Sequence, residues 1–293
     1  MKKIVLSLLI LTIGAVCYSQ TFNQEITDNK GVRNLTGKIN FEKLNNNPYN
    51  TWFTKNYDAY KPNENIISSI KDSLQEYTIQ IFMGTWCGDS KREVPRFYKT
   101  LNNAGFPLDR LTCIAVQADR EHYKQSIGGE HEGLNIHRVP TFIFYKNGKE
   151  INRIVEAPIK TLEEDIKEIV SGTYVPNYSG VTKVHEMISK NGIASLAKDP
   201  QLISELKNEL ASMYELNTYA NVLFFSGNIT ETIEVLKLNT SLFPKEANTY
   251  ISLANKFLIA NNIPEAIANY ERSLEVKKDP EISKRVEELK KSL

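Results

Sequence analysis

Cysteine and unbalanced charge are what this sequence has least of. Its 293 residues include three cysteines, and 36 Lys and Arg stand against 35 Asp and Glu, for a net charge of +1. Such a balance gives no indication of a nucleic-acid partner or of an anionic membrane surface. The sequence also lacks a glycine-rich phosphate loop, a serine triad and a compact metal motif, so no nucleotide or metal cofactor is implied.

An apolar run near the start of the chain predicts a secretory signal peptide at residues 1–19. Two lysines precede the run, which covers residues 4–16 and is too short to span a bilayer comfortably. Cleavage before Gln20 would leave an exported protein, periplasmic or extracellular. The alternative is a lipoprotein anchored through Cys17, although Val16 stands where a small residue is expected.

The most informative stretch is the run at 82–95, FMGTWCGDSKREVP. It follows a short apolar strand at 77–82 and opens a helix expected over about 88–103. Cys87 therefore stands where the free N–H groups and the dipole of a helix favour a negative sulfur. The thiolate is the nucleophile in disulfide exchange, so this position predicts redox chemistry at Cys87.

Two motifs resemble those of the thioredoxin superfamily. The turn from Trp86 to Ser90 resembles the active-site Trp-Cys-X-X-Cys, broken only at Ser90, and Glu93 and Pro95 also match the extracytoplasmic, cytochrome-maturation type. Val139-Pro140-Thr141, before an apolar strand, resembles the cis-proline loop, and Asn147-Gly148 predicts a hairpin after it. The resemblance covers about residues 50–172.

This resemblance implies an α/β thioredoxin-like fold, a mixed sheet flanked by helices. The order of elements fits helices on both faces of the sheet, with a helical turn expected at 121–127. The resemblance further implies that Val139 and Pro140 contact a polypeptide bound at Cys87. Trp86 would flank the sulfur and provide apolar contact area.

Two positions depart from the family pattern. With Ser90 in place of a second cysteine, Cys87 cannot form an internal bridge, and an external thiol must resolve any mixed disulfide. Ser90 could instead donate a hydrogen bond to the sulfur. Ile81, six residues before Cys87, stands where many thioredoxins keep a buried carboxylate that moves protons. Both departures argue against an ordinary dithiol reductase.

Cys113 is the other cysteine that remains after removal of the signal. An exported protein with two cysteines invites a structural disulfide. In the sheet that the resemblance implies, however, Cys113 lies in the strand 111–116, several residues below the end that faces Cys87. At about 3.3 Å per residue this separation exceeds the geometry of a bridge. We therefore expect Cys113 to be a small buried side chain.

A chain of this length suggests about two domains. Strand signals stop after a segment rich in turn residues at 173–180, which we interpret as a linker. The polar leader offers one strand, at 37–41, and a helix is expected at 63–74. The predicted organisation is a signal peptide at 1–19, a leader at 20–50, a thioredoxin-like domain at 51–172, the linker at 173–180 and a helical domain at 181–293.

The helical region contains a repeat. Gly227-Asn228 and Asn261-Asn262 stand 34 positions apart, and apolar residues recur at the same offset. A helix–turn–helix period of 34 residues resembles the tetratricopeptide repeat, more clearly in the second copy. Residues 281–293 resemble the polar cap of such an array. Residues 181–190 and 200–214 are expected to add a helix pair.

The function predicted from the sequence is monothiol thiol–disulfide exchange by an exported protein, with Cys87 as nucleophile and Ser90 beside it. Its substrates would be protein or small-thiol disulfides, its reductant an external thiol, and its repeats would dock a protein partner or the first domain. One alternative is a non-catalytic module that binds polypeptide on the Trp86 and Pro140 surface. Another is a peroxide-reducing or sensing cysteine. His122, His131 and His137 match no compact metal spacing.

Overall fold

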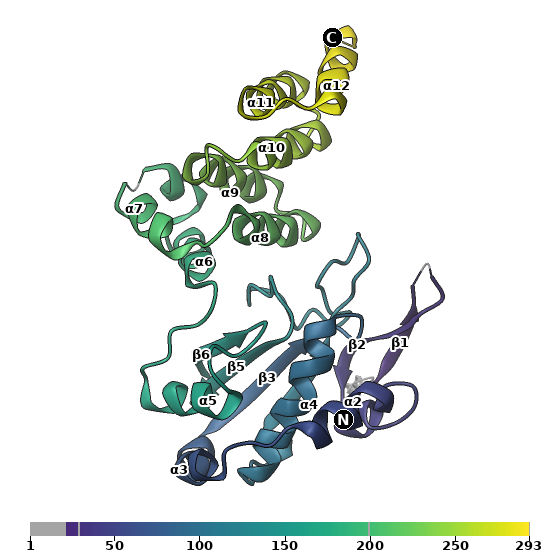
Figure 1. The fold of residues 1–293 in the computed structure, drawn as a ribbon, viewed down its shortest axis with the longest axis vertical. Coiled ribbons are helices and arrows are strands. Elements are labelled where there is room, and N and C mark those ends of the chain that lie inside the picture. Colours follow the sequence, from purple (N-terminus) through teal and green to yellow (C-terminus); the bar gives the residue numbers. More distant parts are fainter. Residues whose placement is uncertain (1–21, 29, 199, 293) are drawn as a thin grey trace, which may run out of the picture.

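The structure is a computed structural model that describes residues 22–28, 30–198 and 200–292. The signal peptide predicted at 1–19, with Cys17, lies outside the described residues. The chain forms an α/β part followed by an all-helical part that extends from one end of it (Figure 1). The predicted fold class, a mixed sheet flanked by helices and then a helical region, is confirmed.

Six strands form one mixed sheet in the order β1-β2-β4-β3-β5-β6. Of the neighbouring pairs only β3 and β4 run parallel, and the rest are antiparallel. The central strands β3 and β4 are apolar because both faces of the sheet are covered there, by one hydrophobic core on the helical side and by a smaller one on the other side. The strands are β1 (Gln24–Thr27), β2 (Arg33–Ile39), β3 (Tyr77–Met83), β4 (Leu111–Ala115), β5 (Thr141–Lys146) and β6 (Lys149–Val155).

One face of the sheet is covered by helices, and a single hydrophobic core joins them to it. Asn63 caps the helix predicted at 63–74 by accepting from the N–H groups of Asn65 and Ile66, and Pro95 lies inside the helix that follows Cys87. The helices are α1 (Phe41–Leu44), α2 (Asn50–Ala59), α3 (Glu64–Leu74), α4 (Gly88–Asn103) and α5 (Leu162–Ser171).

The other face of the sheet differs from the prediction. Its core is a smaller cluster of apolar residues, including Phe82, Ile114 and Ile143, and the segment 117–139 closes it without forming a helix. The helical turn expected at 121–127 is therefore wrong. The Asp119 carboxylate accepts from the N–H groups of residues 121 and 122, and the carbonyl oxygen of residue 125 accepts from the N–H of residue 117. These N–H and carbonyl groups are therefore not free to form the hydrogen bonds of a helical turn.

The described part of the leader, residues 22–28 and 30–50, contributes the strands β1 and β2 to the same sheet. The strand expected at 37–41 is β2, which begins earlier, at Arg33, and pairs with β4. The Thr85 hydroxyl, beside the cysteine turn, accepts from the N–H of Leu35 at 3.0 Å and donates to Asn34 at 3.2 Å. The leader thus supports the turn that carries Cys87, and no break separates it from the rest near residue 50.

The remaining helices have a core of their own, which begins at Val181, whereas the buried residues of the sheet core end at Tyr174. The predicted 200–214 segment is divided, because Ser212 and Glu215 form a capping box that starts a new helix. The helices are α6 (Ser179–Asn191), α7 (Pro200–Glu209), α8 (Met213–Phe225), α9 (Ile229–Leu242), α10 (Ala247–Ile259), α11 (Ile263–Val276) and α12 (Pro280–Lys291).

The 34-residue period is visible in the helix bounds. α8 begins at residue 213 and α10 at residue 247, and α9 and α11 begin at 229 and 263. The C-terminal ends show the same offset of 34 residues. α8 ends at residue 225 and α10 at 259, and α9 ends at 242 and α11 at 276. Two helix pairs therefore repeat one local design. No helix in the described part of the chain is long and apolar enough to cross a membrane.

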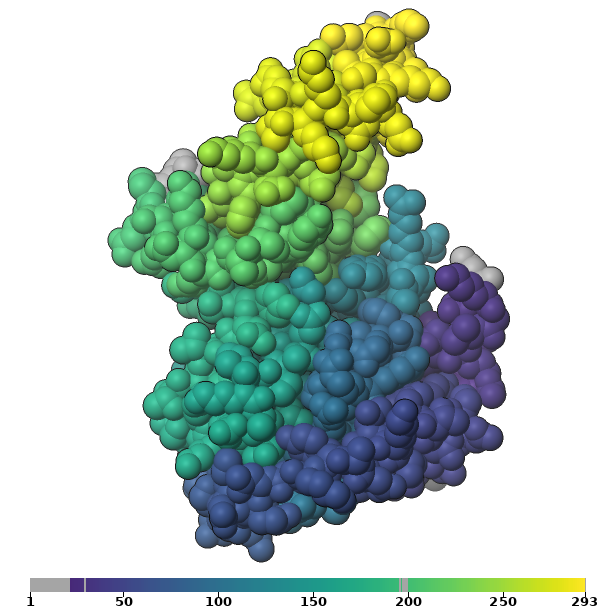
Figure 2. All heavy atoms as spheres, viewed as in Figure 1, coloured from purple at the N-terminus to yellow at the C-terminus, as the bar shows by residue number. Residues whose placement is uncertain are grey.

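The two parts meet along the segment 117–139. The Gln125 side chain donates to the carbonyl oxygen of Phe225 at 2.8 Å, and the rings of Tyr123 and Phe225 meet edge to face at 5.9 Å between centroids. Figure 2 shows the two parts as one continuous body, with this blue-teal segment against the green helices. The end of α8 therefore fixes the loop on the second face of the sheet.

Candidate functional site

Cys87 is the N-cap residue of α4, with its carbonyl oxygen accepting the first helical bond from Lys91 at 3.0 Å. Its own N–H donates to Gly84 at 2.9 Å, which closes the turn after β3. The side chain is partly exposed. The sulfur therefore stands at a helix N-terminus and remains within reach of solvent, as the sequence indicated.

The Val139–Pro140 segment faces the sulfur. The peptide bond between these residues is cis, as expected from the sequence, and the Cys87 thiol donates to the carbonyl oxygen of Val139 at 3.3 Å. Both side chains of the segment are buried. Residues 52 positions apart are thus brought into direct contact, and the segment can meet a bound chain through its backbone groups.

Trp86 is half-buried beside the cysteine and is held in one orientation. Its indole N–H donates to the carbonyl oxygen of Val116, at the end of β4, at 2.8 Å. The ring lies against Gly84, where a Cβ atom would approach it to 2.5 Å. A glycine is therefore required at position 84, and the exposed part of the indole is apolar surface next to the sulfur.

Ser90 has a different partner from the one that we expected. Its side chain is completely buried, and its hydroxyl accepts a hydrogen bond from the N–H of Gly84 at 3.1 Å. Within the described residues no hydrogen bond joins it to the Cys87 sulfur, which donates to Val139 instead. Ser90 therefore ties the first turn of α4 to the end of β3.

The strands beneath the cysteine are apolar. Ile81 is completely buried, so no carboxylate occupies that position. Cys113 is 2% exposed, and burial raises the pKa of its thiol to about 12 although Tyr98 hydrogen-bonds to it. Cys87 and Cys113 are both free. The predictions of a buried, unpaired Cys113 and no bridge to Cys87 are confirmed.

A labelling experiment separates the two thiols. We expect iodoacetamide at neutral pH to modify Cys87 and to spare Cys113 in the native protein, because only the first is reachable and the second stays protonated. Peptide mapping by mass spectrometry reads both sites, and both should be labelled in guanidinium chloride. Native labelling of Cys113 as fast as Cys87 would contradict the burial of β4.

The charged residues at the start of α4 are largely engaged with one another. Arg92 pairs with Asp89 at 2.8 Å and with Glu93 at 2.5 Å, and Arg96 lies 3.4 Å from the same Glu93. The hydrogen bond with Glu93 raises the pKa of the Arg92 guanidinium. The charge of Arg92 is therefore paired with two carboxylates, and the buried Glu93 carboxylate is paired with two arginines.

Sequence reasoning missed Lys124, and it named His137 without expecting its burial; both titratable side chains lie close to the Val139 segment. Lys124 is 6% exposed, and its ammonium donates to the carbonyl oxygen of His137. Burial lowers the pKa of Lys124 to about 8 and that of His137 to about 3. No local pattern distinguishes these residues from solvated loop residues, and only the packing of 117–139 against the sheet buries them.

The histidines considered as metal ligands point to separate partners. His122 meets Asp119 at 2.9 Å, His131 accepts from the N–H of Ser126 at 3.1 Å, and the ring of His137 lies 3.2 Å from the carbonyl oxygen of Asn135. In the described ranges no group of three or more metal-ligating side chains converges.

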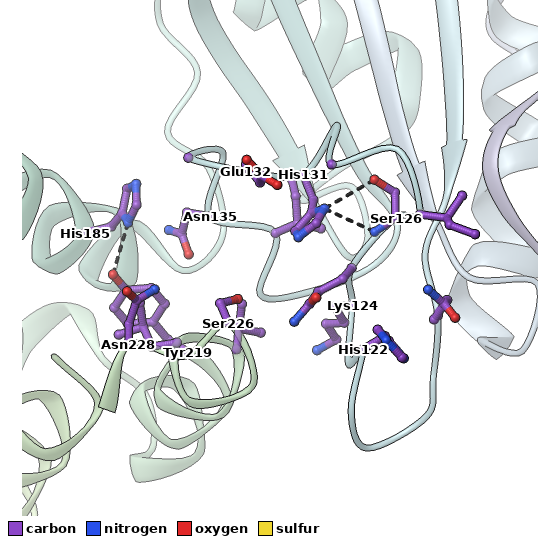
Figure 3. Close-up of a pocket in the computed structure, with 18 residues that line it drawn as sticks. His122, Lys124, Ser126, His131, Glu132, Asn135, His185, Tyr219, Ser226 and Asn228 are labelled. Carbon is purple, nitrogen blue, oxygen red and sulfur yellow. Dashed lines mark hydrogen bonds between the residues drawn. The ribbon is translucent and has the colours of Figure 1, made fainter. Parts of the chain in front are cut away.

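Figure 3 shows His131 and Lys124 at a cavity of about 690 Å³ between the loop and the helices, with Tyr219 and Asn228 on its other side. On the helical side of this cavity the His185 ring and the Tyr219 hydroxyl are 3.0 Å apart.

Comparison with known proteins agrees with this geometry, although no protein-family model matches the chain. Thioredoxin-1 of Schizosaccharomyces pombe is 34% identical over 92 residues, which are 29% of this chain and 74% of that protein. Thioredoxin of Gallus gallus is 28% identical over 103 residues, 35% of this chain and 89% of its own length. Thioredoxin-like protein 1 of S. pombe is 25% identical over 190 residues, 58% of this chain and 62% of that protein. By its match to most of a thioredoxin, this chain belongs to the thioredoxin family.

Proposed function

We propose that this protein carries out monothiol thiol–disulfide exchange through Cys87. Thioredoxin relatives support a thioredoxin-like redox function at the level of the family. The observation that carries the finer proposal is the Cys87 sulfur, partly exposed at the N-terminus of α4 and in contact with Val139 beside the cis Pro140. The second position of the motif holds a serine that is bonded to Gly84.

The reaction has two exchange steps. The Cys87 thiolate attacks one sulfur of a substrate disulfide, a bond forms between the two sulfurs, and the other substrate sulfur leaves as a thiolate. A thiolate from an external thiol then attacks the substrate sulfur of the mixed disulfide and releases Cys87 as a thiolate. Each step exchanges one S–S bond for another and leaves the substrate sulfur bonded to the external thiol. A second external thiolate displaces the substrate from this bond, so two external thiols supply the two electrons.

Protein or small-thiol disulfides fit this site. An extended chain that replaces the Cys87 thiol at the Val139 carbonyl oxygen could pair with that backbone segment, and the exposed face of Trp86 could cover its apolar side chains. The buried side chains of Val139 and Pro140 would then act through their backbone.

The proposal also includes export of the protein and binding of a protein partner by the helical repeats. The basic and apolar start of the chain supports export to the periplasm or the outside, with lipid anchoring at Cys17 as the alternative. The 34-residue spacing of α8–α11 supports a tetratricopeptide-like array. Since α8 contacts the loop at 117–139, the array would present a protein partner near the thiol.

The decisive experiment measures catalysis. The protein should accelerate the reduction of a model disulfide by glutathione, and Cys87→Ala should reduce the rate to that of glutathione alone. Cys113→Ala is the matched control and should retain activity because this thiol is buried. Equal rates for the protein and the Cys87→Ala variant would overturn the proposal and favour a binding module that uses the Trp86 and Pro140 surface.

A further inference from the structure

A second cavity lies where the loop at 117–139 meets the helical part of the molecule. Its volume is about 520 Å³, and its lining comes from the loop and from helices that include α8, α10 and α12. Figure 1 shows these three helices one above the other, with α8 nearest to the sheet. The cavity is therefore shared by the two parts of the chain, and the redox site described above does not include it.

Three cations line this cavity, and no carboxylate of the described residues does. Arg120 comes from the loop, Lys256 from α10 and Arg285 from α12. Within the described part of the chain none of the three forms an ion pair with a carboxylate. The acid next to Arg120, Asp119, is bonded to the ring of His122 at 2.9 Å. In a protein with a net charge of +1, this is a local concentration of positive charge.

The Lys256 ammonium is held at the cavity by two aromatic rings at the end of α8. It lies 3.7 Å from the ring centroid of Phe224 and 5.3 Å from that of Phe225. Burial lowers the pKa of Lys256 to about 8, and the charge of Arg120 acts in the same direction. The two cations therefore repel each other. A carboxylate between them would replace this repulsion by two attractions and would favour the charged lysine.

Side-chain amides stand beside the cations. Asn221 of α8 and Asn255 of α10 are 34 positions apart, so both repeats place an asparagine at the cavity. The side-chain oxygen of Asn255 accepts from the Tyr270 hydroxyl at 2.5 Å, and its amide N–H groups point to no acceptor among the described residues. Amides donate and accept hydrogen bonds as peptide groups do, whereas the cations match carboxylates. The lining therefore fits a peptide that carries acidic side chains.

We propose that this cavity binds an acidic segment of a protein partner, with its carboxylates between Arg120, Lys256 and Arg285. Its peptide groups bond to Asn221 and Asn255. The inference rests on the partner binding that the proposed function includes, and it gives that partner its chemistry.

The loop makes this site a property of the whole molecule. Arg120 reaches the helices because Gln125 of the same loop donates to the carbonyl oxygen of Phe225 at 2.8 Å. The last residue of the loop, Val139, accepts from the Cys87 thiol. A partner bound to the three cations is thus held against the loop that also forms one side of the redox site.

The test measures binding of a short acetylated and amidated peptide of alternating Glu and Ser to Cys87→Ala protein, by fluorescence anisotropy. The same peptide with Gln in place of Glu should bind at least about tenfold more weakly, because it carries no carboxylate. Arg120→Gln and Lys256→Met should each weaken binding of the Glu peptide by about threefold to tenfold. The affinity should also fall as the ionic strength rises, because Arg120 and Arg285 are exposed.

Arg272→Gln is the matched control. It removes an exposed arginine of α11 that does not line the cavity, and it should leave binding unchanged. Arg120 is exposed in a loop, so Arg120→Gln tests the inference even where Lys256→Met does not fold. Failure of the Glu peptide to bind, equal binding of the Glu and Gln peptides, or equal affinities of Arg120→Gln and Arg272→Gln would overturn the inference. Displacement by succinate at the concentration of the peptide itself would also overturn it, because the site would then bind a small anion and not a peptide.

The inference and the redox proposal fail separately, since binding is measured in a protein without the Cys87 thiol. A protein that binds the Glu peptide but does not accelerate disulfide reduction keeps this inference and loses the exchange reaction. A protein that reduces disulfides and does not bind the peptide keeps the reaction and loses this inference.

Discussion

Replacing Ser90 by cysteine is expected to turn a protein that accumulates mixed disulfides into one that releases them. Ser90 lies in the first turn of α4, three residues after Cys87, where side chains share one face of a helix. A second thiol there would attack the mixed disulfide from within the molecule. Because well-oriented intramolecular groups react far faster than free ones, we expect release to be at least about a hundredfold faster.

The measurement uses non-reducing gels. Native Cys87 should retain covalent partners, and Ser90→Cys should lose them and form an internal bridge. Ser90→Ala is the control of matched size, and it should retain the partners because it adds no thiol. Persistent covalent partners in Ser90→Cys, without an internal bridge between the two cysteines of the motif, would show that the first turn of α4 does not bring the two positions together.

Ser90→Cys also removes a buried hydrogen bond. The serine hydroxyl accepts from the N–H of Gly84 at 3.1 Å, and sulfur is a weaker acceptor. The expected cost is about 1–3 kcal/mol of folding free energy, because the buried N–H of Gly84 loses its acceptor. Ser90→Ala loses the same bond, so the comparison of the two variants isolates the effect of the thiol on the chemistry.

His137 is expected to make the protein sensitive to acid. Its folded pKa of about 3 lies below the value of about 6.5 for an unperturbed histidine, chiefly because burial penalises the charged ring. Between these values the unfolded chain binds a proton that the folded chain does not. The stability from the neutral ring is therefore complete above pH 6.5 and is lost as the pH falls toward 3, by about 1.4 kcal/mol per pH unit.

The check compares urea unfolding of the protein and of His137→Phe between pH 7.5 and 4.5. Phenylalanine keeps a ring beside Tyr178, whose centroid lies 5.8 Å from that of His137, and removes the proton site. The stability of the native protein relative to the variant should fall by roughly 2–3 kcal/mol over this range. His122→Phe replaces an exposed histidine of the same loop and should keep most of the acid slope. Parallel curves for the protein and His137→Phe would refute the assignment.

Local sequence signals were reliable where one short segment determines its own structure. The apolar run before Cys87, the glycine after it and the helical pattern beyond predicted β3, the turn and α4. Asn147-Gly148 predicted the hairpin of β5 and β6, and both residues have the positive φ that such a turn requires. The 34-residue spacing likewise reappears in the helix bounds.

Prediction failed where groups that the sequence pattern assigned to one hydrogen-bond partner bond to another. The helical turn expected at 121–127 does not form, since Asp119 and the backbone of residue 117 take up its N–H and carbonyl groups. The hydrogen bond expected from Ser90 to the sulfur is replaced by one from Gly84. The leader, for which one strand was expected, supplies two strands and the residues that bond to Thr85.

The sequence by itself determined the fold class, the position of the Cys87 thiol at a helix N-terminus, the serine at the second position of its motif and the 34-residue repeat, because each depends on neighbouring residues or on a fixed spacing. The tertiary structure decided which groups surround that thiol. Lys124 reaches the carbonyl oxygen of His137, and the Cys87 thiol that of Val139, because the loop at 117–139 is held between the sheet and α8. Their burial, and with it their charge state, depends on packing between distant segments, which no local pattern of polar residues records.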